Sequence, residues 1–291
     1  MLFHELYRLS IAHFLASLLP RVLKTRISRL FYNYNSSFCK GIHLVVPYHP
    51  HGSEVTQKIF INTKEFIGWN IFFLGSYERD TNIILSQTVK AGFHVIEAGA
   101  HIGSETLLIA NFVGGTGKVY AFEPNPMVKR DLNINIQLNN LEKVVEIPEC
   151  ALGENNADID FFVNQASEPN QGMSSKYKFD SNLFTIKVKQ ETIDFWVASN
   201  SIPKIDYIKM DVQGAELDII SGAQNTIDKY RPIIFTEADE SALSDGKNTL
   251  ELLYDALSDL NYSVFLVCAK GERKHLNKQT LKAGNWIAFP N

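Results

Sequence analysis

The chain has 291 residues, of which 45% are hydrophobic and 21% charged, and its formal net charge at pH 7 is −4. This composition excludes a disordered chain, and the net charge gives no global footprint for nucleic-acid binding. No run of about 18 uncharged apolar residues predicts a membrane-spanning helix, and the three cysteines lack the spacing of a disulfide framework or a zinc site. We therefore expect a cytoplasmic protein with no nucleic-acid partner.

Residues 1–40 form a basic N-terminal arm, in which six Lys or Arg residues face a single acid, Glu5. The apolar stretch from Leu9 to Leu19 precedes the basic cluster, which reverses the order in a signal peptide. Two hypotheses stay open. A basic amphipathic helix would make a weak contact with an acidic membrane surface, at the inner membrane face. An ordinary amphipathic helix would instead pack on the main domain or on a second copy of the chain, which we favour.

Residues 41–92 are predicted to form a small N-terminal extension of strands and one helix. The runs 58–61 and 69–74 are rich in β-branched and aromatic residues and flank a turn at 62–68, which predicts two strands. The pattern over 81–90 predicts a helix that ends at Gly92.

Residues 93–291 alternate between strands and helices, which predicts a mostly parallel sheet with helices on both faces. The last two strands have no apolar helix between them, so they are expected to pair as a hairpin and make the final strand antiparallel. The expected strands are 95–96, 119–122, 144–147, 206–210, 233–235, 263–267 and 286–289. The expected helices are 102–112, 127–138, 215–230 and 249–260.

An insertion over residues 158–190 interrupts this alternation. Two predicted strands, 159–163 and 184–188, bracket a polar loop at 164–183. Long loops in compact domains are often functional. We therefore expect this loop, together with the region 41–80, to form the wall of a substrate site.

The first predicted strand runs into a glycine-containing turn that opens a helix, and the second ends in Glu123 about 20 residues later. Glycines in such a turn let the backbone approach a ligand, and an acid after the second strand suits the hydroxyls of a ribose. A dinucleotide would require G-x-G-x-x-G, whereas Gly99 and Gly103 are spaced G-x-x-x-G. Glu97 would repel a diphosphate and attract an ammonium group. S-adenosylmethionine (SAM) carries both a ribose and an ammonium, so we predict SAM as the cofactor and disfavour NAD.

Further acids follow the later strands. Asp211 and Glu237 come directly after two predicted parallel strands, and ligands of open α/β sheets bind beyond such strand ends. In-line methyl transfer to a hydroxyl needs a base, for which Asp211, Glu237 and His101 are the candidates. The alternatives are that Asp211 only caps the following helix, that His101 only touches the cofactor, and that Glu216 is an ordinary first-turn acid. The histidines near residue 50 lack ligand spacing, so we predict no metal site.

Six short motifs in this order resemble the FkbM family of SAM-dependent methyltransferases, over about residues 70–240. The motifs are GSYE at 75–78, VIEAGAHIG at 95–103, AFEPNP at 121–126, ECALG at 149–153, IKMDVQGAE at 208–216 and PIIFTE at 232–237. The resemblance implies a class I, Rossmann-like methyltransferase fold whose seven-stranded, mostly parallel sheet has an antiparallel last strand. One residue departs from the family signature D-x-E-G-x-E, because Gln213 replaces the middle acid.

The resemblance also implies O-methylation of a hydroxyl on a sugar, glycan or secondary metabolite, with S-adenosylhomocysteine (SAH) as the product of the cofactor. N-methylation, carboxyl methylation and a non-catalytic SAM-binding module remain alternatives. Motif by motif, the resemblance assigns Glu97 to the methionine-binding turn, Glu123 to the ribose, and Glu78 to the methionine end of the cofactor. The predicted cofactor-binding residues are Glu78, Glu97, Gly99, Ala100, His101, Gly103, Glu123, Pro124, Glu149, Cys150, Ala151 and Asp211.

Overall fold

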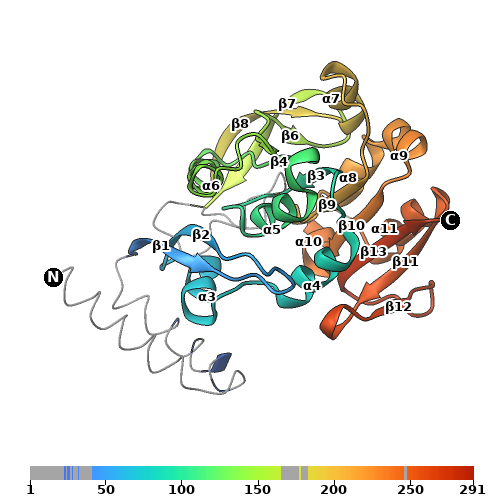
Figure 1. Ribbon diagram of the computed structural model, residues 1–291. Coiled ribbons are helices and arrows are strands. Elements are labelled where there is room, and N and C mark those ends of the chain that lie inside the picture. Colours follow the sequence, from blue (N-terminus) through green and yellow to red (C-terminus); the bar gives the residue numbers. More distant parts are fainter. Residues whose placement is uncertain are drawn as a thin grey trace.

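The computed structural model describes residues 41–164, 183–245 and 248–291 and, outside these ranges, Leu23, Thr25, Arg26, Ser28, Tyr32 and Tyr177. The predicted arm 1–40 and the predicted loop 164–183 thus lie largely outside the described residues. Figure 1 follows the described chain from the N-terminal extension, in blue, through the central sheet to the C-terminal strands, in red.

A mostly parallel sheet forms the centre of the molecule. In the described part of the chain it has eight strands, in the order β12-β11-β13-β10-β9-β3-β4-β5. Strand β13 (Gly284–Pro290) lies antiparallel between β10 and β11 (Tyr262–Val267), which confirms the predicted antiparallel last strand. The parallel strands are β3 (His94–Ala98), β4 (Lys118–Phe122), β5 (Val145–Glu146), β9 (Tyr207–Met210) and β10 (Ile233–Ala238).

The sheet has one edge strand more than the seven expected. This strand, β12 (Arg273–His275), forms in the polar segment that joins the last two predicted strands. It pairs antiparallel with β11, and the ring of His275 lies edge-on against Phe265, with 5.1 Å between the ring centroids. The pairing of β12 with the neighbouring strand β11 therefore adds a strand that the polar sequence of this segment does not predict.

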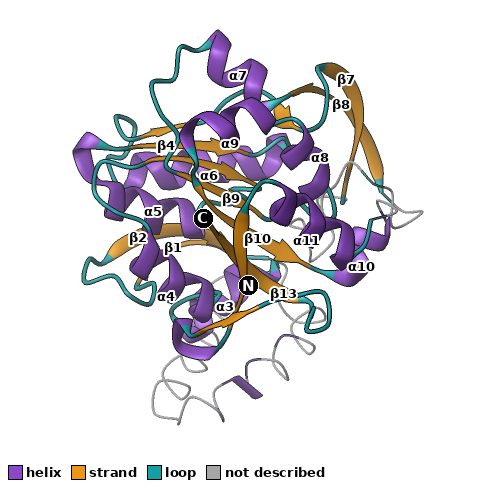
Figure 2. Cartoon of the chain, turned by 90° about the vertical axis from the view of Figure 1, so that its right-hand side faces the viewer, coloured by secondary structure: helices purple, strands orange, loops and turns teal. Residues whose placement is uncertain are grey.

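Helices cover both faces of the sheet and bury a separate apolar core on each, as Figure 2 shows. Successive strand residues point to opposite faces, so Val95 joins one core and Ile96 joins the other. The helices on the first face are α4 (Arg79–Thr88), α5 (Ser104–Val113) and α6 (Pro126–Leu138). Those on the second face are α7 (Ile193–Ser199), α8 (Glu216–Ser221), α9 (Gln224–Tyr230) and α11 (Leu250–Asp259).

The predicted helix 215–230 is in fact two helices, α8 and α9. The chain bends between them at Gly222, where a Cβ atom would lie only 2.1 Å from the carbonyl oxygen of Gly153. The predicted continuous helix is therefore interrupted at the point where the backbone of Gly153 passes close to it.

The N-terminal extension consists of the antiparallel strands β1 (His43–Tyr48) and β2 (Gln57–Asn62) followed by helix α3 (Phe66–Leu74). The prediction of a strand over 69–74 is wrong, because this run is helical. The helix packs on β2 so closely that a Cβ on Gly68 would meet the carbonyl oxygen of Asn62 at 2.2 Å. It ends at Gly75, which adopts the left-handed conformation with φ 83°.

Two asparagines, one in α6 and one directly after it, join the extension to the rest of the fold. The side chain of Asn139 accepts from the backbone N–H of Lys58 at 2.9 Å and donates to the carbonyl of the same residue at 2.7 Å. Asn135 bonds Phe60 on β2 and also donates to the carbonyl of Ile102 at 2.7 Å. The extension is thereby held against the turn that follows β3.

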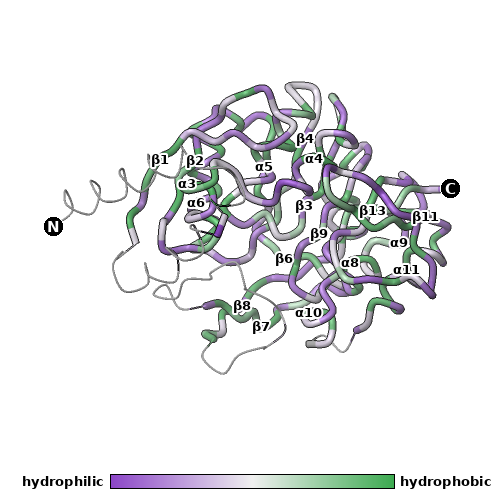
Figure 3. Tube along the Cα trace, turned by 90° about the horizontal axis from the view of Figure 1, so that it is seen from below, coloured by the Kyte–Doolittle hydropathy of each residue, from purple (hydrophilic) through white to green (hydrophobic). Residues whose placement is uncertain are grey.

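The insertion forms a separate small sheet. Strands β7 (Ala157–Val163) and β8 (Phe184–Glu191) pair antiparallel, and β6 (Ala151–Leu152) pairs with β8, which confirms the two predicted strands. Figure 3 shows the β7–β8 hairpin projecting from the edge of the molecule. Among the described helices, none has the length and apolar character needed to cross a membrane.

Candidate active site

A cavity of about 360 Å³ lies at the carboxyl ends of β3, β4, β9 and β10, where ligands of open α/β sheets bind. Three parts of the fold form its wall: the sheet ends, the insertion, and the segments that begin α3 and precede α4. The predicted residues that line it are Glu78, Gly99, His101, Glu123, Pro124, Ala151, Asp211 and Glu237. Further lining residues are Glu65, Phe66, Ile67, Tyr77, Ala98, Phe122, Leu152, Ile159, Phe161, Gln190, Val212, Gln213 and Ala215.

The glycine turn after β3 allows the ends of two strands to meet. Gly99 has φ 82°, and a Cβ atom there would lie 1.9 Å from the carbonyl oxygen of Asp211. The backbone N–H groups of Gly99 and Ala100 both donate to the carbonyl of Phe122, at 3.0 and 3.1 Å. Glycine at this position therefore brings Asp211 next to the turn, and the turn next to the end of β4.

Glu123 is fixed by two backbone donors at the end of β4. One of its oxygens accepts from the N–H of His101 at 3.0 Å, and the other accepts from the N–H of Asn125 at 2.8 Å. Burial raises the pKa of this carboxyl to about 7, and the two N–H donors oppose that rise. Each carboxylate oxygen has further lone pairs, so a rigidly held Glu123 at the cavity wall is able to accept two hydroxyl groups.

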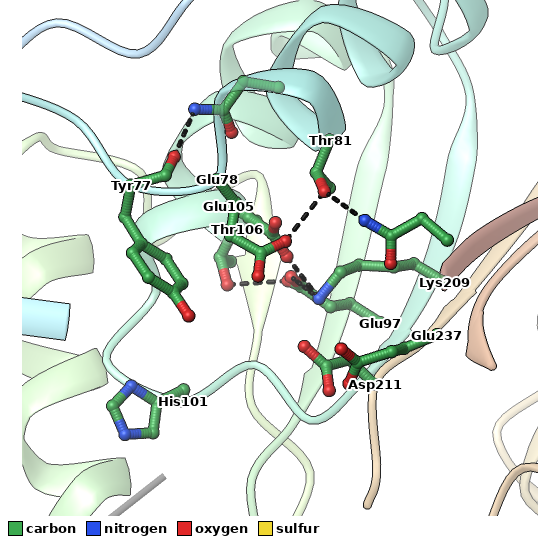
Figure 4. A network of polar contacts seen from close by, with 12 residues as sticks. Tyr77, Glu78, Thr81, Glu97, His101, Glu105, Thr106, Lys209, Asp211 and Glu237 are labelled. Atoms are coloured by element: carbon green, nitrogen blue, oxygen red, sulfur yellow. Dashed lines mark hydrogen bonds and ion pairs between the residues drawn. The ribbon is translucent and has the colours of Figure 1, made fainter. Parts of the chain in front are cut away.

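The carboxyl groups of Glu78, Asp211 and Glu237 converge on the cavity (Figure 4). Gln213 links two of them, because its Nε2 donates to Asp211 Oδ1 and to Glu237 Oε2, both at 3.2 Å. Burial, followed by the charge of Asp211 and a hydrogen bond with it, raises the pKa of Glu237 to about 9. At neutral pH Glu237 is thus mostly protonated.

Glu78 precedes α4 in the left-handed conformation, with φ 49°, and accepts from Thr81 Oγ1 at 2.7 Å. Burial, and then the charges of Glu105 and Asp211, raise the pKa of Glu78 to about 7. A positively charged ligand would favour its ionised form.

A buried cation lies behind the cavity. Lys209 on β9 is 2% exposed and forms an ion pair with Glu105 on α5, and its Nζ lies 3.5 Å from Glu97 Oε1. Burial opposes the charge of Lys209, but Glu105 and Glu97 hold its pKa well above the usual value. Figure 4 shows this ammonium surrounded by the carboxylates. A lysine inside an otherwise apolar strand is the sequence signal that points to such a network.

Glu97 belongs to this network and does not line the cavity. It is fully buried, and its Oε2 accepts from Thr106 Oγ1 at 2.6 Å. Burial raises its pKa to about 7, against the opposing charge of Lys209. Its role as a partner of the cofactor's ammonium group stays a prediction.

His101 is one of the residues that line the cavity. Both of its ring nitrogens are buried, and neither has a hydrogen-bond partner among the described residues. Burial lowers the pKa of His101 to about 4, so the ring is neutral at physiological pH. Two buried nitrogens without partners are costly unless a ligand or water bonds them, so His101 is a candidate to contact a bound molecule.

Glu216 holds the loop that carries Asp211. It is buried, and its Oε1 accepts from the backbone N–H of Val212 at 3.1 Å. The interpretation of Asp211 as a helix cap is wrong, because α8 begins after Ala215 and has no side-chain cap. Asp211 instead faces the cavity.

Besides Glu97, four predicted cofactor residues lie outside the cavity wall: Ala100, Gly103, Glu149 and Cys150. Glu149 is exposed and forms an ion pair with Lys129. Cys150 is buried, its Sγ lies 3.8 Å from Glu191 Oε2, and burial raises its pKa to about 12. Of the predicted cofactor residues at 149–151, only Ala151 reaches the wall, because the chain turns into β6 at this point.

The residues present fit SAM. Five acidic residues line the cavity, and no Lys or Arg does so among the described residues. An acidic cavity of this kind favours a sulfonium cation and disfavours a diphosphate. Glu123 offers acceptors for ribose hydroxyls, and the unpaired nitrogens of His101 offer further polar contacts.

Comparison with known proteins shows that this chain is similar to methyltransferases. The family described as the methyltransferase FkbM domain matches residues 97–264. The 2-O-methyltransferase NoeI of Sinorhizobium fredii is 26% identical over 189 residues, which cover 60% of this chain and 74% of NoeI. The hexuronic acid methyltransferase AglP of Haloferax volcanii is 25% identical over 180 residues, which cover 62% of this chain and 69% of AglP.

A solved structure of methyltransferase FkbM from Methylobacillus flagellatus KT covers 76% of this chain at 17% identity, with a TM-score of 0.44. The match spans 52% of that protein, so this chain corresponds to about half of its length. The seven strands β5-β4-β3-β9-β10-β13-β11 form a mostly parallel sheet with an antiparallel last strand, as the resemblance to the family implied.

Proposed function

Because this chain belongs to the FkbM methyltransferase family, we propose that it transfers the methyl group of SAM to a hydroxyl oxygen of a sugar or glycan. The observation that carries the proposal is the pair of carboxyls of Asp211 and Glu237, linked by Gln213 at the cavity wall. An alcohol must lose its proton as its oxygen is methylated, and the carboxyl group of Asp211 is our candidate acceptor for that proton.

The residues of the cavity divide into two roles. Glu123 accepts hydrogen bonds from the ribose hydroxyls, and His101 contacts the cofactor. Asp211 takes the proton of the acceptor hydroxyl. SAM supplies a methyl group that is activated by the positive charge on its sulfur. Protonated Glu237 hydrogen-bonds Asp211 and so limits the charge of the pair before the acceptor proton arrives.

The names of the relatives support an oxygen atom of a sugar as the acceptor. NoeI is named a 2-O-methyltransferase and AglP a hexuronic acid methyltransferase. Neither name indicates a nitrogen acceptor.

The test is to incubate the purified protein with isotopically labelled SAM and a panel of methyl glycosides, and to analyse the products by mass spectrometry. We expect a labelled product that withstands mild alkali, as an ether does and a carboxyl ester does not. Asp211→Asn is the matched control and should abolish the product. SAH binding in calorimetry with no labelled product from any hydroxyl acceptor would indicate a non-catalytic module. An alkali-labile product would indicate carboxyl methylation.

A further inference from the structure

The small sheet of the insertion contributes one of its faces to the cavity wall. Ala151 on β6 is paired with Gln190 on β8, and Ile159 and Phe161 alternate along β7 in register with the same face of β8. Side chains at such positions point to one side of a sheet. All four residues line the cavity, and so does Leu152. Of these five described residues, only Gln190 has a polar side chain, so the small sheet offers the cavity an apolar surface with one amide.

The amide group of Gln190 is held in a defined orientation. Gln190 is 2% exposed, and its Nε2 donates to the backbone carbonyl of Asn155 at 2.9 Å and to the side-chain Oδ1 of Asn155 at 3.0 Å. A backbone carbonyl accepts hydrogen bonds and cannot donate them, so the amide atom beside it is the nitrogen. Gly153 lies against the same amide, because a Cβ atom there would lie 2.3 Å from both Cδ and Oε1 of Gln190. Glycine at this position therefore makes room for the amide.

This orientation leaves the oxygen of Gln190 to bond a ligand. Its Oε1 is buried and has no hydrogen-bond partner among the described residues. A buried acceptor without a partner is costly unless a donor from a ligand or water reaches it. Because Nε2 is already bonded to Asn155, Gln190 offers an acceptor and not a donor.

The chemistry of SAM indicates which part of the molecule suits this surface. Its ribose carries adenine on one side and the methionine sulfur on the other. In the proposed function Glu123 binds the ribose and the sulfur lies near Asp211, and both residues line the same cavity as the small sheet. Adenine is flat and largely apolar, and the amino group on its edge donates hydrogen bonds. An apolar sheet face with a single acceptor matches that base.

We propose that Gln190 recognises the amino group of adenine, with its Oε1 accepting a hydrogen bond from the exocyclic N–H. The inference rests on the proposed function, because it takes SAM as the cofactor. Gln190 lies in the insertion and outside the sequence motifs that resemble the family. A base with a carbonyl oxygen in place of the amino group would set an acceptor against an acceptor, so Gln190 would select adenine.

The experiment compares SAH with S-inosylhomocysteine, in which a carbonyl oxygen replaces the amino group of adenine. The binding of each nucleoside to the wild-type protein is measured by calorimetry. We expect S-inosylhomocysteine to bind at least about tenfold more weakly, because a site built to bond an N–H rejects an analogue that lacks it. Equal binding of the two nucleosides, or tighter binding of S-inosylhomocysteine, would overturn the inference.

Two variants test whether Gln190 is the source of the preference. Gln190→Met keeps the length of the side chain and removes the acceptor. Gly153→Ala keeps Gln190 but places a methyl group where its amide lies. We expect each variant to reduce the preference for SAH to about threefold or less. Gln137→Met, at an exposed position of α6 outside the cavity, is the matched control and should keep the full preference. A full preference in Gln190→Met, with thermal unfolding like that of the wild type, would overturn the inference.

Methyl transfer to sugar hydroxyls is measured separately, so that the inference and the proposed function fail in different ways. A preference for SAH without any methylated product would support the inference and contradict the proposed function. Methyl transfer together with equal binding of the two nucleosides would contradict the inference alone. If Gln190→Met bound both nucleosides as the wild type does but had a raised KM for the sugar, the small sheet would belong to the acceptor site, and the inference would be overturned.

Discussion

Replacement of Gln213 by Glu tests how the proposed base is controlled. In the wild type one amide nitrogen donates to both Asp211 and Glu237, at 3.2 Å each. Gln213→Glu keeps the length of the side chain, removes this shared donor, and places a third carboxyl group against the other two. It also restores the acid that is usual in the family signature, so the substitution is chemically tolerable. The three groups are expected to bind one more proton at neutral pH.

The magnitude follows from the distances. Two ionised carboxylates about 4 Å apart repel by about 4 kcal/mol at an effective dielectric constant of 20. Because Gln213 is partly exposed, solvent screening and side-chain movement reduce this to about 1.5–3 kcal/mol. A shift of one pKa unit corresponds to about 1.4 kcal/mol, so the pKa of the carboxyl pair should rise by about 1–2 units. Methyl transfer needs an ionised base, and the acid limb of the rate profile therefore moves to higher pH.

The assay is the pH dependence of kcat/KM for methyl transfer between pH 5.5 and 10. The control is Gln213→Met, which removes the donor and adds no charge, and it should shift the profile less than Gln213→Glu. Thermal unfolding of each variant checks that the fold is retained. A profile of Gln213→Glu that rises at the same pH as that of the wild type would refute the assignment of the base to this carboxyl pair.

Three other substitutions separate binding, chemistry and stability. Glu123→Ala should weaken SAH binding by about 1.5–3 kcal/mol in calorimetry, because charge-assisted hydrogen bonds to the ribose are lost, and an unchanged Kd would argue against that contact. Asp211→Asn should lower kcat by about 10²–10⁴-fold while the Kd of SAH changes less than threefold. Equal losses of both would mean that Asp211 supports the cofactor site and not the chemistry. Lys209→Met should lower the free energy of unfolding by about 3–5 kcal/mol in urea denaturation, because Glu97 and Glu105 lose their buried cation. A loss below about 1 kcal/mol would contradict this account.

The central sheet was predictable because its sequence signals are local and repeated. Each parallel strand is a short apolar run, and a helix with its own start and stop follows within a few residues. Burial on both faces explains why residues such as Val95 and Ile96 are apolar in succession. The same logic placed Asp211 and Glu237 together, since parallel strands bring their carboxyl ends to one edge.

The sequence predicted that the region 41–80 contributes to the cavity wall, but not how it does so, because this depends on contacts between distant segments. The run from Trp69 to Leu74 is apolar on all sides, so its period does not distinguish a strand from a helix. The close approach of Gly68 to Asn62 and the left-handed Gly75 decide in favour of the helix. The start of that helix then carries Phe66 into the cavity wall. No pattern in the sequence predicts that Phe66 lies in the cavity wall.

Three residues at the cavity have a backbone conformation that is unfavourable for the stability of the fold. Glu78, His101 and Gln213 adopt the left-handed conformation, with φ of 49°, 50° and 54°, and the side chains of all three line the cavity. Such a conformation costs a residue other than glycine about 1 kcal/mol or more. Elsewhere in the described chain several residues with positive φ end a helix, where this conformation is ordinary; these are Asn140, Ser201, Arg231 and Asn261.

Glycine would remove the cost at the three cavity positions, and the chain does use it beside them, at Gly99, Gly103 and Gly214. A side chain is therefore retained at Glu78, His101 and Gln213 against the preference of the backbone. Of these three, Glu78 and Gln213 interact with the carboxyl pair or its neighbours, and His101 has two buried ring nitrogens without a hydrogen-bond partner among the described residues. The proposed function gives these side chains a role toward a bound ligand, which would offset the cost to the fold.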